Sequence, residues 1–234
     1  MAAAFVAAAI LTVVVVAACD VTPAVTFPLP PAPATSGPAS TPIAPKPLGA
    51  AAAALAALPV KGRAPKTGYT RAQFGPAWAD TDRDGSDQRN QVLGRDLTAV
   101  IKRGRCVVMT GVLRDPYTGA TVPFIRGALT SDDVQIDHVV ALSNAWQTGA
   151  QALDVYRREM IATDPLNLLA VDGPTNQSKG DGDAATWLPP AKGYRCAYVA
   201  RQVAVKTRYK LWVTTAERDA IGRVLADCPG QALP

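Results

Sequence analysis

The distribution of proline most strongly limits which part of this chain can form a compact domain. Ten of the twenty prolines lie between residues 20 and 59. Proline fixes φ and removes a backbone donor, so a stretch of this kind favours an extended spacer. Its end, residues 50–58, is alanine-rich and predicts a short helix that Pro59 stops. We therefore expect a Pro/Ala-rich linker over 20–59 and a folded domain over 60–234.

The residues before this spacer predict an export signal. Residues 2–18 carry no charge and are almost wholly Ala, Val, Ile and Leu. The run is short for a membrane span and ends in small residues, as the apolar part of a signal peptide does. It leads into Val16-Ala-Ala-Cys19, which resembles a bacterial lipobox, where the cysteine is lipidated after cleavage. We expect a signal peptide over 1–19 and an extracellular or cell-surface protein, anchored to the membrane only through Cys19.

Charge and hydropathy allow a globular protein that binds polyanions. Lys and Arg outnumber Asp and Glu by 24 to 19, which gives a net charge of +5 and a pI near 9.1. An excess of this size permits contact with nucleic acid but does not require it. With 48% apolar residues, the folded part can bury one substantial core.

Secondary-structure signals predict a mixed α+β domain. The clearest is a hairpin, with strands over 105–114 and 121–126 and the turn Asp115-Pro-Tyr-Thr-Gly119 between them. The other expected strands cover 134–140 and 167–171. The expected helices cover 88–97, with Ser86 as its cap, 143–162 and 194–209. A further helix has Pro174 in its first turn and carries Asn176 and Lys179.

The four cysteines suggest a bridge between the last two helices. Cys196 opens the helix over 194–209, and Cys228 lies on the apolar face of a final helix that begins with the capping box Thr214-Thr-Ala-Glu217. A Cys196–Cys228 bridge would contribute about 3–4 kcal/mol in the chain-entropy estimate. Cys106 would then be a free thiol. Bridges from Cys106 to either partner stay open, because spacing does not settle connectivity.

The chemistry centres on the only histidine of the chain. His138 directly follows Asp137, and Asn167 and Asn176 come further along. Histidine suits proton transfer near neutral pH, and an adjacent carboxylate can hold a metal beside it. The order Asp-His, Asn, Asn therefore indicates a nuclease. The plain alternatives are that Asn176 only starts a helix and that Lys179 is only a solvated surface residue.

These residues resemble the HNH endonuclease superfamily with its ββα-metal core. The chain is also similar to exported actinobacterial proteins related to the GmrSD restriction endonuclease C-terminal domain, from about Leu58 to Cys228. The stretches that carry the resemblance are Ile136-Asp-His-Val-Val-Ala-Leu, Asp164-Pro-Leu-Asn-Leu-Leu-Ala-Val, Asn176-Gln-Ser-Lys-Gly-Asp-Gly-Asp-Ala-Ala-Thr-Trp-Leu-Pro-Pro190, Asp115-Pro-Tyr-Thr-Gly and Arg195-Cys-Ala-Tyr. The fold it implies is an HNH core with a β-hairpin and additional packing helices.

The resemblance also implies a role for each site residue. His138 would be the general base, and Asp137 and Asn176 would be metal ligands in an HNN version of the motif. Asn167 would hold the histidine-bearing segment by hydrogen bonds, and Lys179 would contact the phosphate. Two oxygen ligands, with water and phosphate completing the shell, favour Mg²⁺ or Mn²⁺.

Two acidic residues beyond Lys179 have alternative interpretations. Either Asp181 or Asp183 would support the metal through water; the alternative for Asp183 is that it caps a helix that begins at Ala184.

One segment departs from the family pattern. Relatives usually have cysteine where Ser86 stands, paired with the equivalent of Cys106, so the resemblance leaves Cys106 without that partner. Nearby, Asp80-x-Asp-x-Asp-Gly85 mimics the start of an EF-hand loop. Gln91, however, occupies the position where a bidentate glutamate is expected, which favours a turn with helix-capping acids.

The sequence thus predicts an exported, metal-dependent endonuclease that hydrolyses phosphodiester bonds of DNA with low sequence specificity. The alternative is a non-catalytic cell-surface lipoprotein of the same fold that binds polyanions or calcium. No protein partner is indicated.

Overall fold

The structure is a computed structural model that describes residues 49–234. The expected signal peptide over 1–19, the expected lipid site Cys19 and most of the expected linker lie outside the described residues. The described part combines α-helices with two antiparallel sheets, so the mixed α+β class is confirmed. None of the helices in this part is long and apolar enough to cross a membrane.

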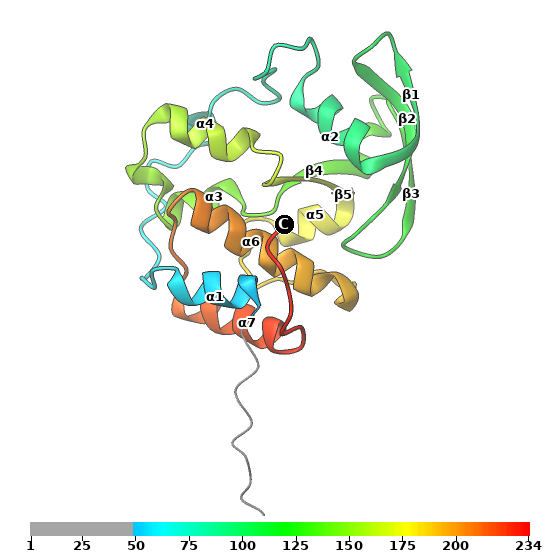
Figure 1. The fold of residues 1–234 in the computed structure, drawn as a ribbon. Coiled ribbons are helices and arrows are strands. Elements are labelled where there is room, and N and C mark those ends of the chain that lie inside the picture. Colours follow the sequence, from blue (N-terminus) through cyan, green and yellow to red (C-terminus); the bar gives the residue numbers. More distant parts are fainter. Residues whose placement is uncertain (1–48) are drawn as a thin grey trace, which may run out of the picture. The chain divides into compact units, whose positions relative to one another are not determined.

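One antiparallel sheet has the strand order β1-β2-β3 (Figure 1). Its strands are β1, Leu97–Arg103, β2, Val107–Arg114, and β3, Thr121–Ile125. The predicted hairpin is confirmed by β2 and β3, and Gly119 ends its turn at a φ of 80°, which glycine tolerates. Strand β1 was not predicted. Its residues are mostly exposed and its pairing with β2 is interrupted by register shifts, so it lacks a clear alternating pattern.

The second sheet consists of β4, Val134–His138, and β5, Leu168–Asp172. The two strands are antiparallel, with Asp137 opposite Leu169 and His138 opposite Leu168. Successive side chains of a strand point to opposite faces. Asp137 and His138 therefore leave β4 on different sides.

Helix α5, Gly173–Lys179, follows β5 directly and packs against both strands of this sheet (Figure 1). Asp172 caps the helix by accepting a hydrogen bond from the Thr175 amide at 2.9 Å, and Pro174 lies in the first turn, as predicted. The result is a continuous strand–helix unit that carries Asn176 and Lys179 toward the end of β4.

Helix α2, Gln88–Asp96, fills the space between the two sheets. The apolar residues that form this shared cluster are Val92, Leu93, Leu97, Val108, Leu113, Phe124, Val134, Ile136, Leu168 and Ala170. Asp87 caps α2 by accepting a hydrogen bond from the Asn90 amide at 2.8 Å. The expected cap Ser86 is therefore wrong by one residue.

The single helix predicted over 143–162 is instead divided into α3, Leu142–Gln147, and α4, Val155–Thr163. Gly149 adopts a φ of 130° between them, which ends α3. Asp154 then starts α4 by accepting a hydrogen bond from the Arg157 amide at 2.7 Å. The apolar stripe alone did not reveal this break.

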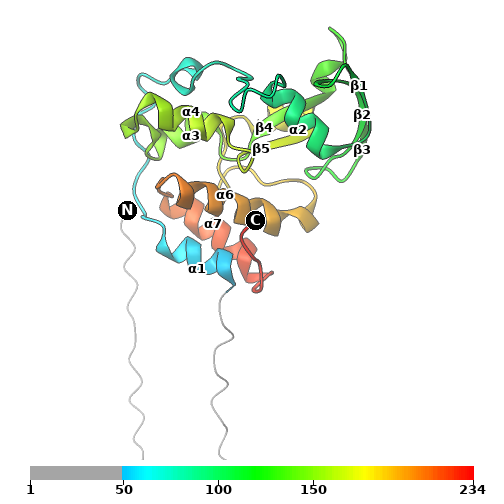
Figure 2. The same ribbon diagram turned by 45° about the horizontal axis from the view of Figure 1, so that its top comes forward.

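Three helices form a layer on the side of β4 and β5 away from the first sheet, as Figures 1 and 2 show. They are α1, Ala50–Ala57, α6, Arg195–Arg208, and α7, Thr215–Ala226. The predicted bridge Cys196–Cys228 is present, and the predicted capping box of Thr214 and Glu217 starts α7. Among the described residues, Cys106 is the free cysteine.

The folded part begins earlier than the expected boundary at residue 60. The predicted short helix forms as α1, but it packs against α6 and α7 and belongs to the domain. The C-terminal tail also contacts its start: the amides of Gly49 and Ala51 donate hydrogen bonds to the carbonyls of Pro229 and Gln231, at 2.9 and 3.1 Å. Apolar burial and these backbone bonds explain why this alanine-rich segment is ordered.

Candidate functional site

Three of the predicted site residues line one pocket. Asp137, His138 and Asn176 surround a cavity of about 410 Å³ at the end of β4 and α5. A larger pocket of about 690 Å³ lies beside α4, but none of the predicted site residues lines it. Chemistry rather than size therefore identifies the smaller pocket as the candidate active site.

The ring of His138 has a defined orientation. Its Nε2 lies 3.0 Å from the carbonyl oxygen of Ala162. Because a carbonyl can only accept, Nε2 carries the proton and Nδ1 has the free lone pair. Burial lowers the pKa of His138 to about 4, although the Ala162 carbonyl acts in the opposite direction. The ring is therefore neutral at physiological pH and able to accept a proton at Nδ1.

Asp137 is nearly buried, and both of its carboxylate oxygens have protein partners. Oδ1 lies 2.8 Å from Nζ of Lys179, and Oδ2 accepts a hydrogen bond from the Tyr117 hydroxyl at 2.5 Å. Burial and the Asp137 charge raise the pKa of Tyr117 well above its ordinary value, so this phenol remains a donor. The carboxylate is thus held from two sides.

Lys179 does not have the expected position. Its side chain is fully buried, and Nζ donates to Oδ1 of Asp137 and to the carbonyl of His138, both at 2.8 Å. The sequence predicted a contact with the phosphate, whereas the structure places the ammonium group in an enclosed position beside Asp137. Helical spacing correctly placed it one turn after Asn176 but did not show which way the long side chain turns.

Asn167 connects the segment after β4 to the end of α4. Its Oδ1 accepts from the Val140 amide at 2.8 Å, and its Nδ2 donates to the carbonyls of Val140 and Ile161 at 3.3 and 3.0 Å. The side chain is completely buried. Ile161 precedes Ala162, so Asn167 also fixes the region that supplies the carbonyl partner of His138.

Asn176 has a partner for its amide nitrogen but none for its amide oxygen among the described residues. Its Nδ2 donates to Oε1 of Gln135 at 2.9 Å, and no donor from residues 49–234 reaches its Oδ1. Asn176 and Asp137 line the same pocket, and each carboxylate oxygen of Asp137 retains a second lone pair. Hard oxygen donors of this kind fit Mg²⁺ or Mn²⁺, so the residues present are compatible with the expected ions.

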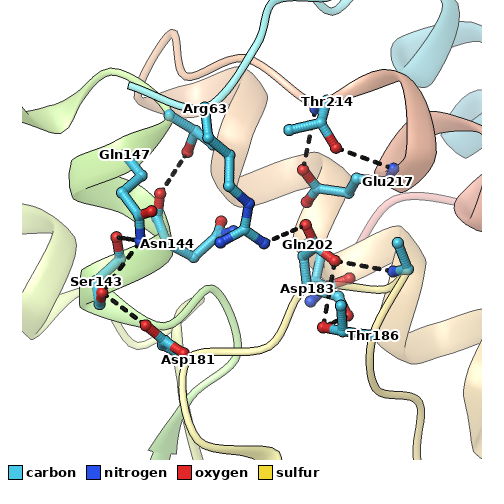
Figure 3. Close-up of polar contacts among 12 residues, drawn as sticks. Arg63, Ser143, Asn144, Gln147, Asp181, Asp183, Thr186, Gln202, Thr214 and Glu217 are labelled. Carbon is cyan, nitrogen blue, oxygen red and sulfur yellow. Dashed lines mark hydrogen bonds and ion pairs between the residues drawn. The ribbon is translucent and has the colours of Figure 1, made fainter. Parts of the chain in front are cut away.

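The two acidic residues after Lys179 differ in surroundings. Asp181 lines the pocket, where it pairs with Lys66 and accepts from the Ser143 hydroxyl, each at 2.9 Å. Asp183 is buried and pairs with Arg63 at 2.6 Å (Figure 3). Its Oδ1 accepts from the Ala185 amide at 3.0 Å, but the segment forms a turn and not the expected helix. Asp183 is therefore a structural residue.

The Asp80-x-Asp-x-Asp motif forms an exposed acidic turn. Asp80, Asp82 and Asp84 place ligand atoms within 4.8 Å of one another. Their oxygens accept hydrogen bonds from the loop itself, including the amides of Gly85 at 2.9 Å and Ser86 at 2.7 Å. This network agrees with the interpretation as a turn before α2.

Sequence reasoning did not identify three contributors to the site. Tyr117 was noted only as part of the family-like turn Asp115–Gly119, and nothing in that turn indicated that its hydroxyl reaches Asp137. Lys66 and Arg71 line the pocket from a segment more than sixty residues before His138. No local motif marks either residue, so only the tertiary fold reveals them.

Two comparisons with known proteins relate this geometry to a family. The family model "GmrSD restriction endonucleases, C-terminal domain" matches residues 84–224. An Arthroderma benhamiae protein named "Uncharacterized secreted protein" is 38% identical over 197 residues, which cover 83% of this chain and 93% of that protein. No solved structure matches the chain. The family match spans the strand–helix unit and more than half of the sequence, and the chain therefore belongs to the family of GmrSD restriction endonuclease C-terminal domains.

Proposed function

We propose that this protein is an exported, metal-dependent HNH-type endonuclease that hydrolyses phosphodiester bonds of DNA with low sequence specificity. The observation that carries the proposal is the imidazole of His138 in a pocket that Asp137 and Asn176 also line, with Nε2 bound to the Ala162 carbonyl and Nδ1 left with its lone pair. Family membership supports a nuclease-related function, and the succession of β4, β5 and α5 is the order expected of a ββα-metal core.

His138 would act as the general base. Its Nε2 proton is held by Ala162, so Nδ1 would remove a proton from the attacking water. The lowered pKa keeps this nitrogen unprotonated at neutral pH. The water oxygen then forms a bond to phosphorus, and the bond from phosphorus to the 3′ oxygen breaks, which leaves a 5′-phosphate end.

Asp137 and Asn176 would hold Mg²⁺ or Mn²⁺. When bound, the ion would stabilise the negative charge that develops on the phosphate and on the departing oxygen. Tyr117 and Lys179 hold the Asp137 carboxylate in place, and Lys179 also binds the carbonyl of His138. We therefore assign Lys179 a positioning role beside Asn167, which organises the segment after β4.

Export is supported by the sequence of the N-terminal region and by the relative from Arthroderma benhamiae, whose name describes it as secreted. We propose an extracellular or cell-surface location, with Cys19 as the site of a lipid anchor. A nuclease that contacts the DNA backbone and not the base edges would show the low sequence preference proposed here.

A plasmid-nicking assay tests the function. Wild-type protein should convert supercoiled plasmid in Mg²⁺ and lose activity in EDTA. His138→Ala should lower the rate by about 10²–10⁴-fold, the usual contribution of a general base. Gln177→Ala, an exposed change on α5 outside the pocket, is the matched control and should cleave normally. Equal background conversion by wild type and His138→Ala would contradict the proposal and favour the non-catalytic binding protein.

A further inference from the structure

A segment outside the family match completes the pocket. Residues 59–75, here called the N-terminal strap, run from α1 along α3 toward α4 and lie before the matched residues 84–224 (Figure 1). Backbone hydrogen bonds fix the strap to the domain: the amide of Lys61 donates to Val213 at 3.0 Å, and that of Ala64 donates to Gln147 at 2.9 Å. Its position is therefore defined by the fold.

The strap contributes two cationic side chains to the pocket, Lys66 and Arg71. They differ in whether an acidic side chain pairs with them. Lys66 pairs with Asp181 at 2.9 Å, and its Nζ lies 5.7 Å from the ring centre of Tyr69. Arg71 has no acidic partner among the described residues. The guanidinium of Arg71 is thus the less neutralised of the two charges.

Arg71 is held through one nitrogen of its guanidinium group, which leaves the other N–H donors available. Its Nη1 donates to the carbonyls of Phe74 at 3.4 Å and Gly75 at 2.9 Å. Within residues 49–234, Nε and Nη2 have no acceptor. The side chain is partly buried, and Arg71 and His138 line the same pocket.

We propose that Arg71 binds a non-bridging oxygen of the scissile phosphodiester next to His138. This inference rests on the proposed nuclease function and names a residue that recognises its substrate. A guanidinium fork whose Nε and Nη2 are unused matches a phosphate, and binding the backbone carries no sequence information. Lys179 is less suited to this contact, because its side chain is fully buried and two of its three donors already bind Asp137 and the carbonyl of His138. The sequence predicted that Lys179, within the family match, contacts the phosphate. In this proposal Arg71 of the strap makes that contact instead.

Binding without cleavage gives the direct test. A fluorescein-labelled 16-base-pair DNA duplex is titrated in EDTA, and the anisotropy is followed at several salt concentrations. Arg71→Ala should raise the Kd by about tenfold or more, as the loss of a charge-assisted hydrogen bond predicts, and should reduce the salt slope by about 1. Arg71→Lys should lie between wild type and Arg71→Ala, because lysine keeps the charge without the fork.

Two further variants separate the phosphate contact from general effects. Arg103→Ala removes the same charge from an exposed position outside the pocket and should bind nearly as wild type. Arg71→Gln keeps a donor for the strap carbonyls while removing the charge, so its thermal unfolding should match wild type although its binding is weak. Equal Kd values for Arg71→Ala and Arg103→Ala, or no duplex binding by wild type, would overturn the inference.

Cleavage in Mg²⁺ is measured in parallel. Arg71→Ala should lower kcat/KM by about 10²-fold or more, and Arg103→Ala should not. If binding depends on Arg71 but wild type cleaves nothing, the proposed nuclease function fails, whereas the contact of Arg71 with a backbone phosphate stands. If wild type cleaves and Arg71→Ala behaves as Arg103→Ala in both assays, the phosphate contact fails while the nuclease function stands.

Discussion

Asp137 brings a negative charge into a nearly buried position, where Lys179 and Tyr117 compensate it from other parts of the chain. Removing one partner of a buried ion pair leaves the other charge without compensation, and this usually costs more than the pair contributes. The stability of the site and the orientation of the proposed metal ligand therefore depend on the same contact.

Lys179→Met tests this dependence. The free energy of unfolding should fall by about 3–5 kcal/mol, because Asp137 remains buried without its cation. Urea denaturation measures the loss, and Lys192→Met, which changes an exposed lysine, should stay within about 0.5 kcal/mol of wild type. Adding Asp137→Asn to Lys179→Met should recover part of the loss. An unchanged urea midpoint for Lys179→Met would show that the pair does not stabilise the fold.

His138 predicts how stability depends on pH. Its pKa in the folded protein, about 4, lies below the value of 6.5 for an unperturbed histidine, so the unfolded chain binds more protons between these values. In EDTA, the free energy of unfolding should decrease as the pH falls from 6.5 to 4. The decrease from this group is at most about 3.5 kcal/mol, at about 1.4 kcal/mol per pKa unit. His138→Gln should weaken the dependence in this window, and an identical slope in both proteins would contradict the pKa shift.

At the scale of single residues, the sequence predicted those site residues that lie close together in the chain. Asp137 and His138 are adjacent, and Asn176 follows a strand that pairs with theirs, so β-pairing brings the three together. The sequence did not show that Lys179 pairs with Asp137, and it did not identify Arg71. The direction of a long side chain and the approach of a distant segment depend on tertiary packing, which a linear motif does not contain.

Among the elements, those with strong local signals were predicted and those defined by their surroundings were not. The hairpin of β2 and β3 has a turn with a left-handed glycine, and α7 has a capping box, and both are present. The exposed edge strand β1 has neither signal. The break between α3 and α4 depends on the backbone of Gly149, where Trp212 packs closely, and no apolar periodicity reports such a contact.

The contact between the start of α2 and the β1–β2 turn also indicates where a second disulfide fits. The Ser86 hydroxyl lies 3.5 Å from the carbonyl of Cys106, and this contact joins the start of α2 to the β1–β2 turn. Ser86→Cys should form a disulfide with Cys106 and stabilise the protein by about 3 kcal/mol, as a loop of about this length allows. Loss of the free thiol and a higher urea midpoint would report it. Cys106→Ser in the same background should abolish both effects, and a persistent free thiol would show that the geometry does not permit closure.

For the molecule as a whole, the mixed class and the site region were predictable, but the extent of the domain was not. Composition placed residues 50–58 in the linker because alanine and proline dominate there. The structure instead packs α1 against α6 and α7, and its strap continues to the pocket. The domain that binds substrate in our proposal is thus longer at its N-terminal side than the family match.

The hydrogen bonds from the amides of Gly49 and Ala51 to the carbonyls of Pro229 and Gln231 join the two ends of the folded part. Mechanical tension applied at residue 49 would therefore load α1 and the C-terminal tail first. The bridge between Cys196 and Cys228 closes the same layer covalently. Force that enters at residue 49 would reach α1 and its contacts with α6 and α7 before the strands that carry Asp137 and His138, because α1 comes first along the chain.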